Sequence, residues 1–332
     1  MIPIIKPEIN FQEIESELKE IFKSGILTKG PRVKKFEKIV AKYVGTKYAF
    51  ATTSATTALH LSLAALGIGP KDEVLVADFT FPATANVVVQ QGAKPVLVDI
   101  SLDNYNIDKK DLERKITKRT KAIIPVDVFG SPVDMISIMK IAKKYNLAVV
   151  EDAACALGAE YKNKKTGTLG DTGCFSFHPR KSITTGEGGM VVTNNSELAK
   201  KISILRDHGG VFSKKKGFFS FEMAGFNYRM TEVQALLGIY QMKNIDKIIN
   251  QKRNLAKIYS KILSNIKGVK LPQEMPYGRH TYQSYVVLLD KKINRNKVIK
   301  IMRKKGIETT LGTYALHAQP FLSKIMATEQ GS

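Results

Sequence analysis

Residues that build disulfide scaffolds, zinc sites and membrane spans are scarce in this sequence. Its 332 residues include only two cysteines, Cys155 and Cys174, which cannot form a disulfide framework and favour a reducing compartment. The five histidines lack metal-ligand spacing with one another or with the cysteines, so we expect no metal site. No apolar run approaches the roughly 18 residues of a membrane helix, and the N-terminus is a poor signal peptide. The sequence therefore predicts a cytoplasmic protein without a membrane span.

Acidic residues are also scarce relative to basic ones. The chain has 52 Lys and Arg against 30 Asp and Glu, a formal net charge of +22. Such a balance can mark nucleic-acid binding, but the basic residues are scattered in pairs and triplets without interleaved aromatic residues. We therefore expect mostly solvated faces and no nucleic-acid partner, while the positive field would suit a small substrate that carries phosphate.

Apolar runs typical of strands alternate with amphipathic helical patterns through the first two-thirds of the chain. The expected strands are 73–77, 95–99, 122–126, 148–151, 174–177 and 190–193, and the expected helices between them include 56–66, 83–91 and 135–145. Continuous apolar strands separated by helices indicate a mostly parallel sheet covered on both faces. After Thr231 the pattern changes to a long Lys-rich helix, a strand at 282–289 and a helix near 296–304. We predict a large α/β domain over residues 1–240 and a smaller α+β domain over residues 241–332.

The stretch CFSFHPRKSITTGEGGMVV, residues 174–192, places a single lysine, Lys181, at the start of a glycine-rich loop between two expected strands. Pro179 cannot donate to a sheet ladder, and the glycines of TTGEGG permit positive φ. The loop therefore has a specific shape, and its lysine requires an explanation.

Two other stretches supply groups that fit one chemistry with this lysine. A buried strand ends at Glu151 and Asp152, where α/β sheets bind ligands, although one acid could simply cap the next segment. Ser54 and Thr56 precede an amphipathic helix whose N-terminus could hold a phosphate, although ordinary N-capping explains this stretch equally well. Together a lysine, a carboxylate and a helix N-terminus match the aldehyde, pyridine nitrogen and phosphate of pyridoxal phosphate.

In these motifs the sequence resembles the DegT/DnrJ/StrS-type sugar-nucleotide aminotransferases, which have pyridoxal-phosphate fold type I of the aspartate aminotransferase superfamily. The motifs that carry the resemblance include SATTALHLSLAALGIGPKDEV, FTFPATANVV, EDAACALGA, FSFHPRKSITTGEGGMVVTN, GFNYRMTEVQA and GTYALHAQP, spread over roughly residues 25–320. The resemblance implies a mostly parallel sheet of the seven-stranded type, sandwiched by helices, and a smaller α+β C-terminal domain. Family members continue for several dozen residues beyond the equivalent of this chain's end, so an incomplete small domain is expected.

The resemblance also implies a role for each matching residue. Lys181 would bind pyridoxal 5′-phosphate as a Schiff base and move a proton to and from the substrate carbon, and Asp152 would keep the pyridine nitrogen protonated. Phe81 would stack on the cofactor ring. The implied phosphate ligands are Ala55, Thr56, Ser176 and Asn227. Asn227 would reach the site of a neighbouring subunit, which implies a homodimer, and Tyr314 and His317 are the candidates for contacting substrate.

Three positions depart from the family pattern. Ala55 stands where many members carry Gly, Cys155 replaces a frequent Gln or His, and Asp127 stands where relatives often have His. The last two departures bear on substrate preference rather than on cofactor use.

The function implied is transfer of an amino group from glutamate or glutamine to a nucleotide-linked keto-sugar, with pyridoxamine phosphate as intermediate, for aminosugar and cell-surface polysaccharide biosynthesis. A first alternative is a sugar dehydratase on the same scaffold, which uses pyridoxamine phosphate without a Schiff-base lysine; Lys181 argues against it. A second is a non-catalytic binding protein, although no helix-turn-helix, RNA-recognition or finger pattern is present. The sugar, the nucleotide and the position of the ketone stay open.

Overall fold

The computed structural model describes residues 1–213 and 217–328. The helices are α1 Glu15–Ser24, α2 Pro31–Val44, α3 Ala55–Leu66, α4 Ala83–Gln90, α5 Lys109–Arg114, α6 Met135–Tyr145, α7 Ser196–Leu205, α8 Glu232–Lys243, α9 Ile245–Leu263, α10 Arg295–Lys304 and α11 Pro320–Thr328. The strands are β1 Tyr48–Thr52, β2 Glu73–Ala77, β3 Phe79–Thr80, β4 Lys94–Val98, β5 Thr120–Ile124, β6 Ala148–Asp152, β7 Glu160–Tyr161, β8 Lys164–Lys165, β9 Thr172–Ser176, β10 Gly189–Thr193, β11 Gly210–Ser213, β12 Phe218–Phe221, β13 Val269–Lys270, β14 Gly278–Arg279, β15 Leu288–Leu289 and β16 Tyr314–Ala315.

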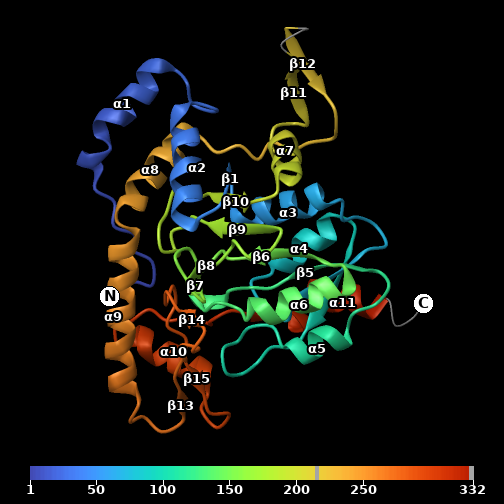
Figure 1. Ribbon diagram of the computed structural model, residues 1–332. Coiled ribbons are helices and arrows are strands. Elements are labelled where there is room, and N and C mark those ends of the chain that lie inside the picture. The colour runs from blue at the N-terminus through green and yellow to red at the C-terminus, as the bar shows by residue number, and fades with distance from the viewer. Residues whose placement is uncertain (214–216, 329–332) are drawn as a thin grey trace.

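A seven-stranded sheet with the order β1-β10-β9-β6-β5-β2-β4 forms the centre of the molecule (Figure 1). The neighbours from β9 to β4 pair in parallel, whereas β10 runs antiparallel to both β9 and β1. Every residue of β2, β9 and β10 is buried, as expected for strands covered on both faces. The predicted mostly parallel sheet is confirmed, with one antiparallel strand inserted near its edge.

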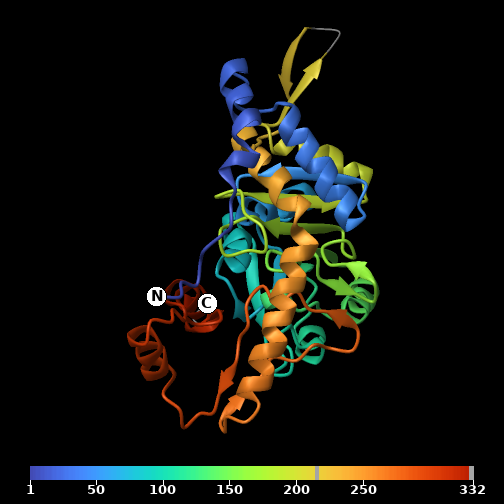
Figure 2. The same ribbon diagram turned by 90° about the vertical axis from the view of Figure 1, so that its left-hand side faces the viewer.

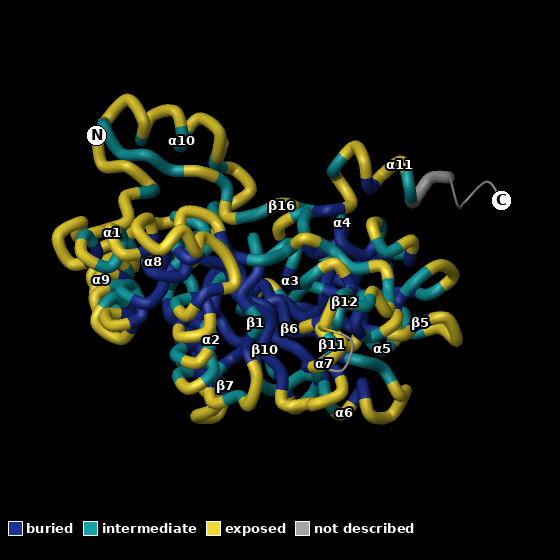
Figure 3. The backbone as a smooth tube through the Cα atoms, turned by 90° about the horizontal axis from the view of Figure 1, so that it is seen from above, coloured by how far each residue is buried: buried dark blue, intermediate teal, exposed yellow. Residues whose placement is uncertain are grey.

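Helices cover both faces of this sheet, and the alternation of strand residues shows which helices share a face. Val74 and Val76 of β2 pack with α3, α4 and α7, whereas Leu75 and Ala77 pack with α5 and α6. Met190 of β10 packs with α2 and α8 on the same side as α5 and α6. Figure 3 shows the strands as a dark-blue buried centre within a mostly exposed shell. The resulting three-layer sandwich brings the carboxyl ends of the parallel strands to one edge.

Two expectations for the C-terminal third are wrong. The single long helix after Thr231 is two helices, α8 and α9, which meet at Asn244. The strand expected at 282–289 is reduced to β15. Tyr282, the first residue of the expected strand, has a φ of +50°, in the left-handed region outside the extended conformation of a strand. Sequence pattern also missed β1, whose YAFAT run was not recognised as a strand.

The C-terminal third leaves the sheet and returns to it. Helix α9 runs along the body (Figure 2), with Ile245 and Ile249 buried against it. The chain then passes through β13, β15 and α10, where the main chain of Ile307 bridges to Ile2, and β16 pairs with β3 of the central region. The division of the chain at residue 240 stays a prediction. Within the described residues, no helix has the length and apolarity to span a membrane.

Candidate active site

Strand pairing brings the N-terminus of α3 next to the end of β9. Gly189 lies opposite Ser176 on one side and Thr52 on the other. A Cβ atom at Gly189 would lie 2.3 Å from the carbonyl carbon of Ser54 and 2.6 Å from the nitrogen of Ala55. Only glycine therefore allows β10 to approach the turn into α3 this closely. Three of the predicted phosphate ligands, Ala55, Thr56 and Ser176, are thus gathered at one point.

The first turn of α3 is both capped and open to an anion. Ser54 Oγ accepts from Thr57 N at 3.1 Å, and Thr57 Oγ1 accepts from Ser54 N at 3.0 Å, a reciprocal capping box. This cap uses one of the N–H groups that every helix start leaves without an intrahelical carbonyl. The N–H groups of Ala55 and Thr56 precede it in the same turn, where the helix dipole favours a phosphate. Capping and phosphate binding are compatible here rather than alternatives.

Asp152 ends β6 as a buried, oriented carboxylate. Thr84 Oγ1 donates to its Oδ2 at 2.8 Å, and Ala154 N donates to its Oδ1 at 3.2 Å. Burial raises the pKa of Asp152, while the bonds from Thr84 and Ala154 and the charge of Lys181 act to lower it. Such a carboxylate can face a protonated ring nitrogen without further rearrangement.

Lys181 reaches the same place from the loop after β9. Its Nζ lies 3.0 Å from the Sγ of Cys155, three residues after Asp152, and its charge acts on the Asp152 carboxyl group. The lysine and the acid predicted from sequence are therefore neighbours. The contact with Cys155, at a position where the family pattern differs, was not predicted.

Glu151, the other acid of this pair, points away from Lys181. Its carboxylate accepts from the main-chain N–H groups of Gly167, Leu169 and Gly170 at 2.9, 2.5 and 2.6 Å. Burial raises the pKa of Glu151 to about 7, against the lowering effect of those three hydrogen bonds. Glu151 thus fixes the loop that leads into β9, and only Asp152 belongs to the site.

Phe81 and Tyr314 form an aromatic pair next to the β3–β16 pairing. Phe81 follows β3 and is 63% exposed, and its ring centroid is 6.3 Å from that of Tyr314. The contact exists because β16 pairs with β3, with Tyr314 opposite Thr80. Thr84, whose hydroxyl donates to Asp152, also donates to the main-chain oxygen of Phe81. The exposed Phe81 ring therefore lies on the turn next to Asp152, where it can stack on a cofactor ring.

Asn227 is the predicted ligand that the fold does not bring to Lys181. It is exposed on the segment after the β11–β12 hairpin and bridges to Asp207. The neighbouring Tyr228 accepts from Thr53 N at 3.2 Å, so this segment runs beside the turn into α3. Its role toward a second subunit stays a prediction.

Asp127 and Thr84 lie next to Asp152; sequence reasoning related Asp127 only to substrate preference and assigned Thr84 no role. Asp127 is 1% exposed; its Oδ1 accepts from Val133 N at 2.9 Å, and its Oδ2 has no hydrogen-bond partner among the described residues. Burial and the charges of Glu151 and Asp152 raise the pKa of Asp127 well above its usual range, although the bond from Val133 N acts to lower it. Thr84 lies in the FTFPATANVV motif, but nothing local marks it as the donor to Asp152.

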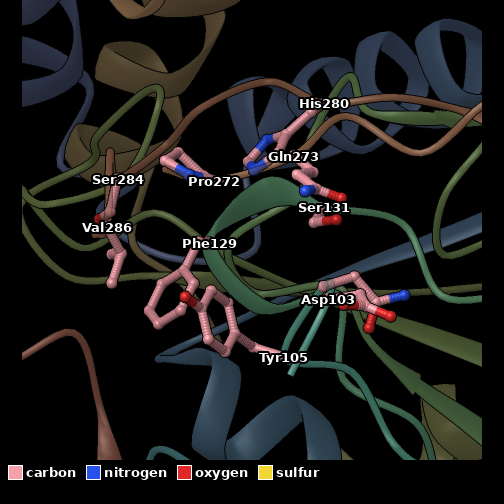
Figure 4. A pocket seen from close by; sticks show the side chains of 10 residues that line it. Asp103, Tyr105, Phe129, Ser131, Pro272, Gln273, His280, Ser284 and Val286 are labelled. Carbon is pink, nitrogen blue, oxygen red and sulfur yellow. The ribbon is translucent and has the colours of Figure 1, made fainter. Parts of the chain in front are cut away.

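A separate small pocket lies between the loop at residues 103–105 and the segment at 272–286 (Figure 4). Its wall includes Tyr105 and Phe129, whose ring centroids are 6.1 Å apart, and Phe129 also packs on Phe79 of β3. None of the predicted site residues lines it. The pocket is therefore separate from the residues grouped around Lys181, and Phe129 links its wall to β3.

The geometry, a lysine and a buried acid at one end and a helix N-terminus at the other, fits pyridoxal phosphate. The family described as DegT/DnrJ/EryC1/StrS aminotransferases matches residues 8–331. The chain belongs to this family. The predictions of fold type I, of pyridoxal phosphate as cofactor and of an aminotransferase are confirmed.

Individual relatives agree with the family. GDP-perosamine synthase of Caulobacter vibrioides is 40% identical over 322 residues, which cover 96% of this chain and 86% of the relative. The solved structure of Helicobacter pylori PseC, an aminotransferase of pseudoaminic acid biosynthesis, superposes with a TM-score of 0.92 at 31% identity, covering 98% and 88% of the two chains. A Streptococcus pneumoniae protein described as a sugar aminotransferase, in its PMP form, gives 0.92 at 27% identity with the same coverage.

Proposed function

We propose that this aminotransferase moves an amino group from glutamate or glutamine to a nucleotide-linked keto-sugar, as a step of aminosugar and polysaccharide biosynthesis. The observation that carries the proposal is the neighbouring pair of Lys181 and Asp152, together with the N-terminus of α3, where the N–H groups of Ala55 and Thr56 precede the capped Thr57. The matching relatives that act on nucleotide-linked sugars, among them GDP-perosamine synthase, support the substrate class. The net charge of +22 suits a diphosphate-bearing substrate.

Each residue of the site has a task in this reaction. When bound, pyridoxal phosphate supplies an aldehyde that condenses with amines and a ring that accepts an electron pair. Lys181 Nζ holds the cofactor and then carries a proton to and from the substrate carbon. Asp152, with both carboxylate oxygens held by donors, keeps the ring nitrogen protonated. Ala55, Thr56 and Ser176 bind the phosphate and thereby fix the position of the ring.

In this proposal the C-terminal segment contacts the substrate. Tyr314 contacts the Phe81 ring, and His317 follows three residues later on the same segment, where an acceptor sugar would meet the cofactor ring.

We also propose a homodimer that shares its two sites. The β11–β12 hairpin projects from the body (Figure 1) and exposes Phe212, Phe218, Phe219 and Phe221 by half or more. Exposed aromatic clusters of this kind mark protein interfaces. A second copy that covers the hairpin would bring Asn227 toward the partner's phosphate end.

Cys155 and Cys174 are both free thiols, which supports a cytoplasmic location.

The test is a covalent trapping experiment. Purified enzyme reduced with borohydride should retain the cofactor on the tryptic peptide that contains Lys181, and glutamate added first should remove the trapped species by converting the cofactor to its amine form. Lys181→Ala should lose the label, whereas Lys200→Ala on the exposed face of α7 should keep it.

A panel of keto-sugar nucleotides then identifies the acceptor. Amino-sugar product with loss of glutamate supports the proposal. Deoxysugar product without incorporated nitrogen would instead support the dehydratase. A label that persists in Lys181→Ala would overturn the assignment of the lysine.

A further inference from the structure

Asp78 joins the end of β2 to the returning C-terminal segment. The main-chain oxygen of Asp78 accepts from Leu316 N at 2.7 Å, and its Oδ1 accepts from His317 N at 2.8 Å. Its other carboxylate oxygen, Oδ2, pairs with His317 Nδ1. One acid thus holds both the main chain and the imidazole of a residue that lies 239 positions away.

This contact determines which nitrogen of His317 carries hydrogen. A carboxylate oxygen only accepts, so the hydrogen between the two groups belongs to Nδ1. In the neutral imidazole, Nε2 then has a lone pair and acts as an acceptor. The His317 side chain is 61% exposed and that of Asp78 only 20%, so the ring stays accessible while the carboxylate that orients it is largely covered.

The pair lies at the rim of the Lys181 site. Asp152 is hydrogen-bonded to Thr84 at 2.8 Å, and Thr84 Oγ1 lies 3.2 Å from Thr80 Oγ1. Thr80 is the register partner of Tyr314, and His317 follows three residues later. A short series of residues, through Thr84 and Thr80, therefore connects the Asp152 carboxylate with the segment that carries the His317 imidazole.

The segment that carries His317 is firmly anchored. Leu316 and Leu322 are buried in the same apolar cluster as α3 and α4, and Ser323 Oγ donates to the main-chain oxygen of His317 at 2.5 Å. Because these contacts fix the main chain at His317, the hydrogen bond to Asp78 can set the orientation of the ring.

We propose that Asp78 is a positioning residue that holds His317 as its Nδ1–H tautomer, so that Nε2 accepts a hydrogen bond from a hydroxyl group of the acceptor sugar. This inference rests on the proposed function and assigns a specificity-determining contact within it. The alternative is that Asp78 only clips β16 to β3.

Asp78→Asn separates these two roles. The amide oxygen can still accept from His317 N, which preserves the clip, but the amide NH2 donates to Nδ1 and moves the ring hydrogen to Nε2. The ring then presents a donor where the sugar hydroxyl needs an acceptor. We expect the KM for the keto-sugar to rise about 10-fold, with the rate of cofactor conversion by glutamate within about 2-fold of wild type.

A direct readout of the tautomer does not depend on turnover. Histidine 15N NMR of the holoenzyme in alkaline buffer, assigned with His317→Phe, should show Nδ1–H in wild type and Nε2–H in Asp78→Asn. The same tautomer in both proteins would overturn the proposal, as would an unchanged KM for the keto-sugar in Asp78→Asn.

A double-mutant cycle completes the test. If Asp78 acts through His317, Asp78→Asn combined with His317→Phe should lose no more keto-sugar affinity than His317→Phe alone; additive losses would overturn the proposal. Asp72→Asn, at the opposite end of β2, is the matched control and should behave as wild type. Failure of the proposed function would look different, because wild-type enzyme itself would then turn over none of the keto-sugars.

Discussion

Three carboxyl groups, Asp127, Glu151 and Asp152, lie at the carboxyl ends of β5 and β6, and burial raises the pKa of each. Their hydrogen bonds differ, and so do their tasks. Asp152 has a donor on each oxygen, Glu151 binds three main-chain N–H groups, and Asp127 leaves one oxygen without a partner among the described residues. The hydrogen-bond partners of each acid, rather than its residue type, therefore decide which of the three is held in place for the cofactor.

Asp127 should make stability depend on pH. The folded protein holds the Asp127 proton at pH values where the unfolded chain, with a pKa of about 3.9, has lost it. The folded state then binds more protons, so stability falls as pH rises through that window. Asp127→Asn removes this loss and should raise the melting temperature at pH 8 by about 2–4 °C, with the gain vanishing toward pH 4.

Calorimetry of wild type and Asp127→Asn across this pH range is the measurement. Asp127→Ala is the control, because it removes the acceptor for Val133 N and should destabilise the protein at every pH. An equal loss of stability for Asp127→Asn at pH 5 and pH 8 would contradict the raised pKa.

Thr84 should act on the cofactor through Asp152. Its hydroxyl is the side-chain donor that favours the charged form of that carboxyl group, alongside Ala154 N. Thr84→Val should raise the pKa of Asp152 further and weaken pyridoxal phosphate binding roughly 10-fold, about 1.4 kcal/mol. Thr84→Ser keeps the hydroxyl and should bind near wild type. Spectral titration of apoenzyme measures both, and equal affinities for Val and Ser variants would exclude the role.

At the scale of elements, β10 and α3 must approach closely to form the phosphate end. A Cβ at position 189 would enter the main chain of Ser54 and Ala55. Gly189→Ala should therefore displace the first turn of α3 and cost about 1–3 kcal/mol of stability, together with cofactor affinity. Gly69→Ala, where a Cβ meets nothing within 4 Å, is the matched control.

Urea unfolding and cofactor titration of both glycine variants check this expectation. The two variants should separate clearly, because the added atom is the same and only its surroundings differ. A Gly189→Ala protein as stable as Gly69→Ala, with wild-type cofactor affinity, would show that the strands can move apart at no cost.

At the scale of the whole molecule, the β11–β12 hairpin should hold the dimer together. Replacing Phe219 and Phe221 with Ser removes two of the exposed rings and should shift the protein to monomer at micromolar concentration. Light scattering after size exclusion measures the mass. Ile136→Ser, an exposed apolar residue on α6, should leave the mass unchanged, and a dimer that survives loss of both rings would rule the hairpin out.

Local patterns in the sequence determined much of this protein by themselves. The alternation of buried strands and amphipathic helices predicted the layered fold, because burial on two faces leaves a continuous apolar run. The motifs around Lys181, Asp152 and Ser54 predicted the cofactor, because each supplies a group with a distinct chemical task. These features depend on neighbours only a few residues apart.

Only the tertiary structure decided how distant segments meet. Nothing within EDAAC indicates that Glu151 anchors a loop while Asp152 faces Lys181, and no local signal joins Asp78 to His317 across 239 positions. Likewise, nothing local shows that Tyr282, at the start of a segment that reads as a strand, is left-handed. The physical reason is common to all three: strand order and side-chain burial set these contacts, and both arise from the packing of the entire chain.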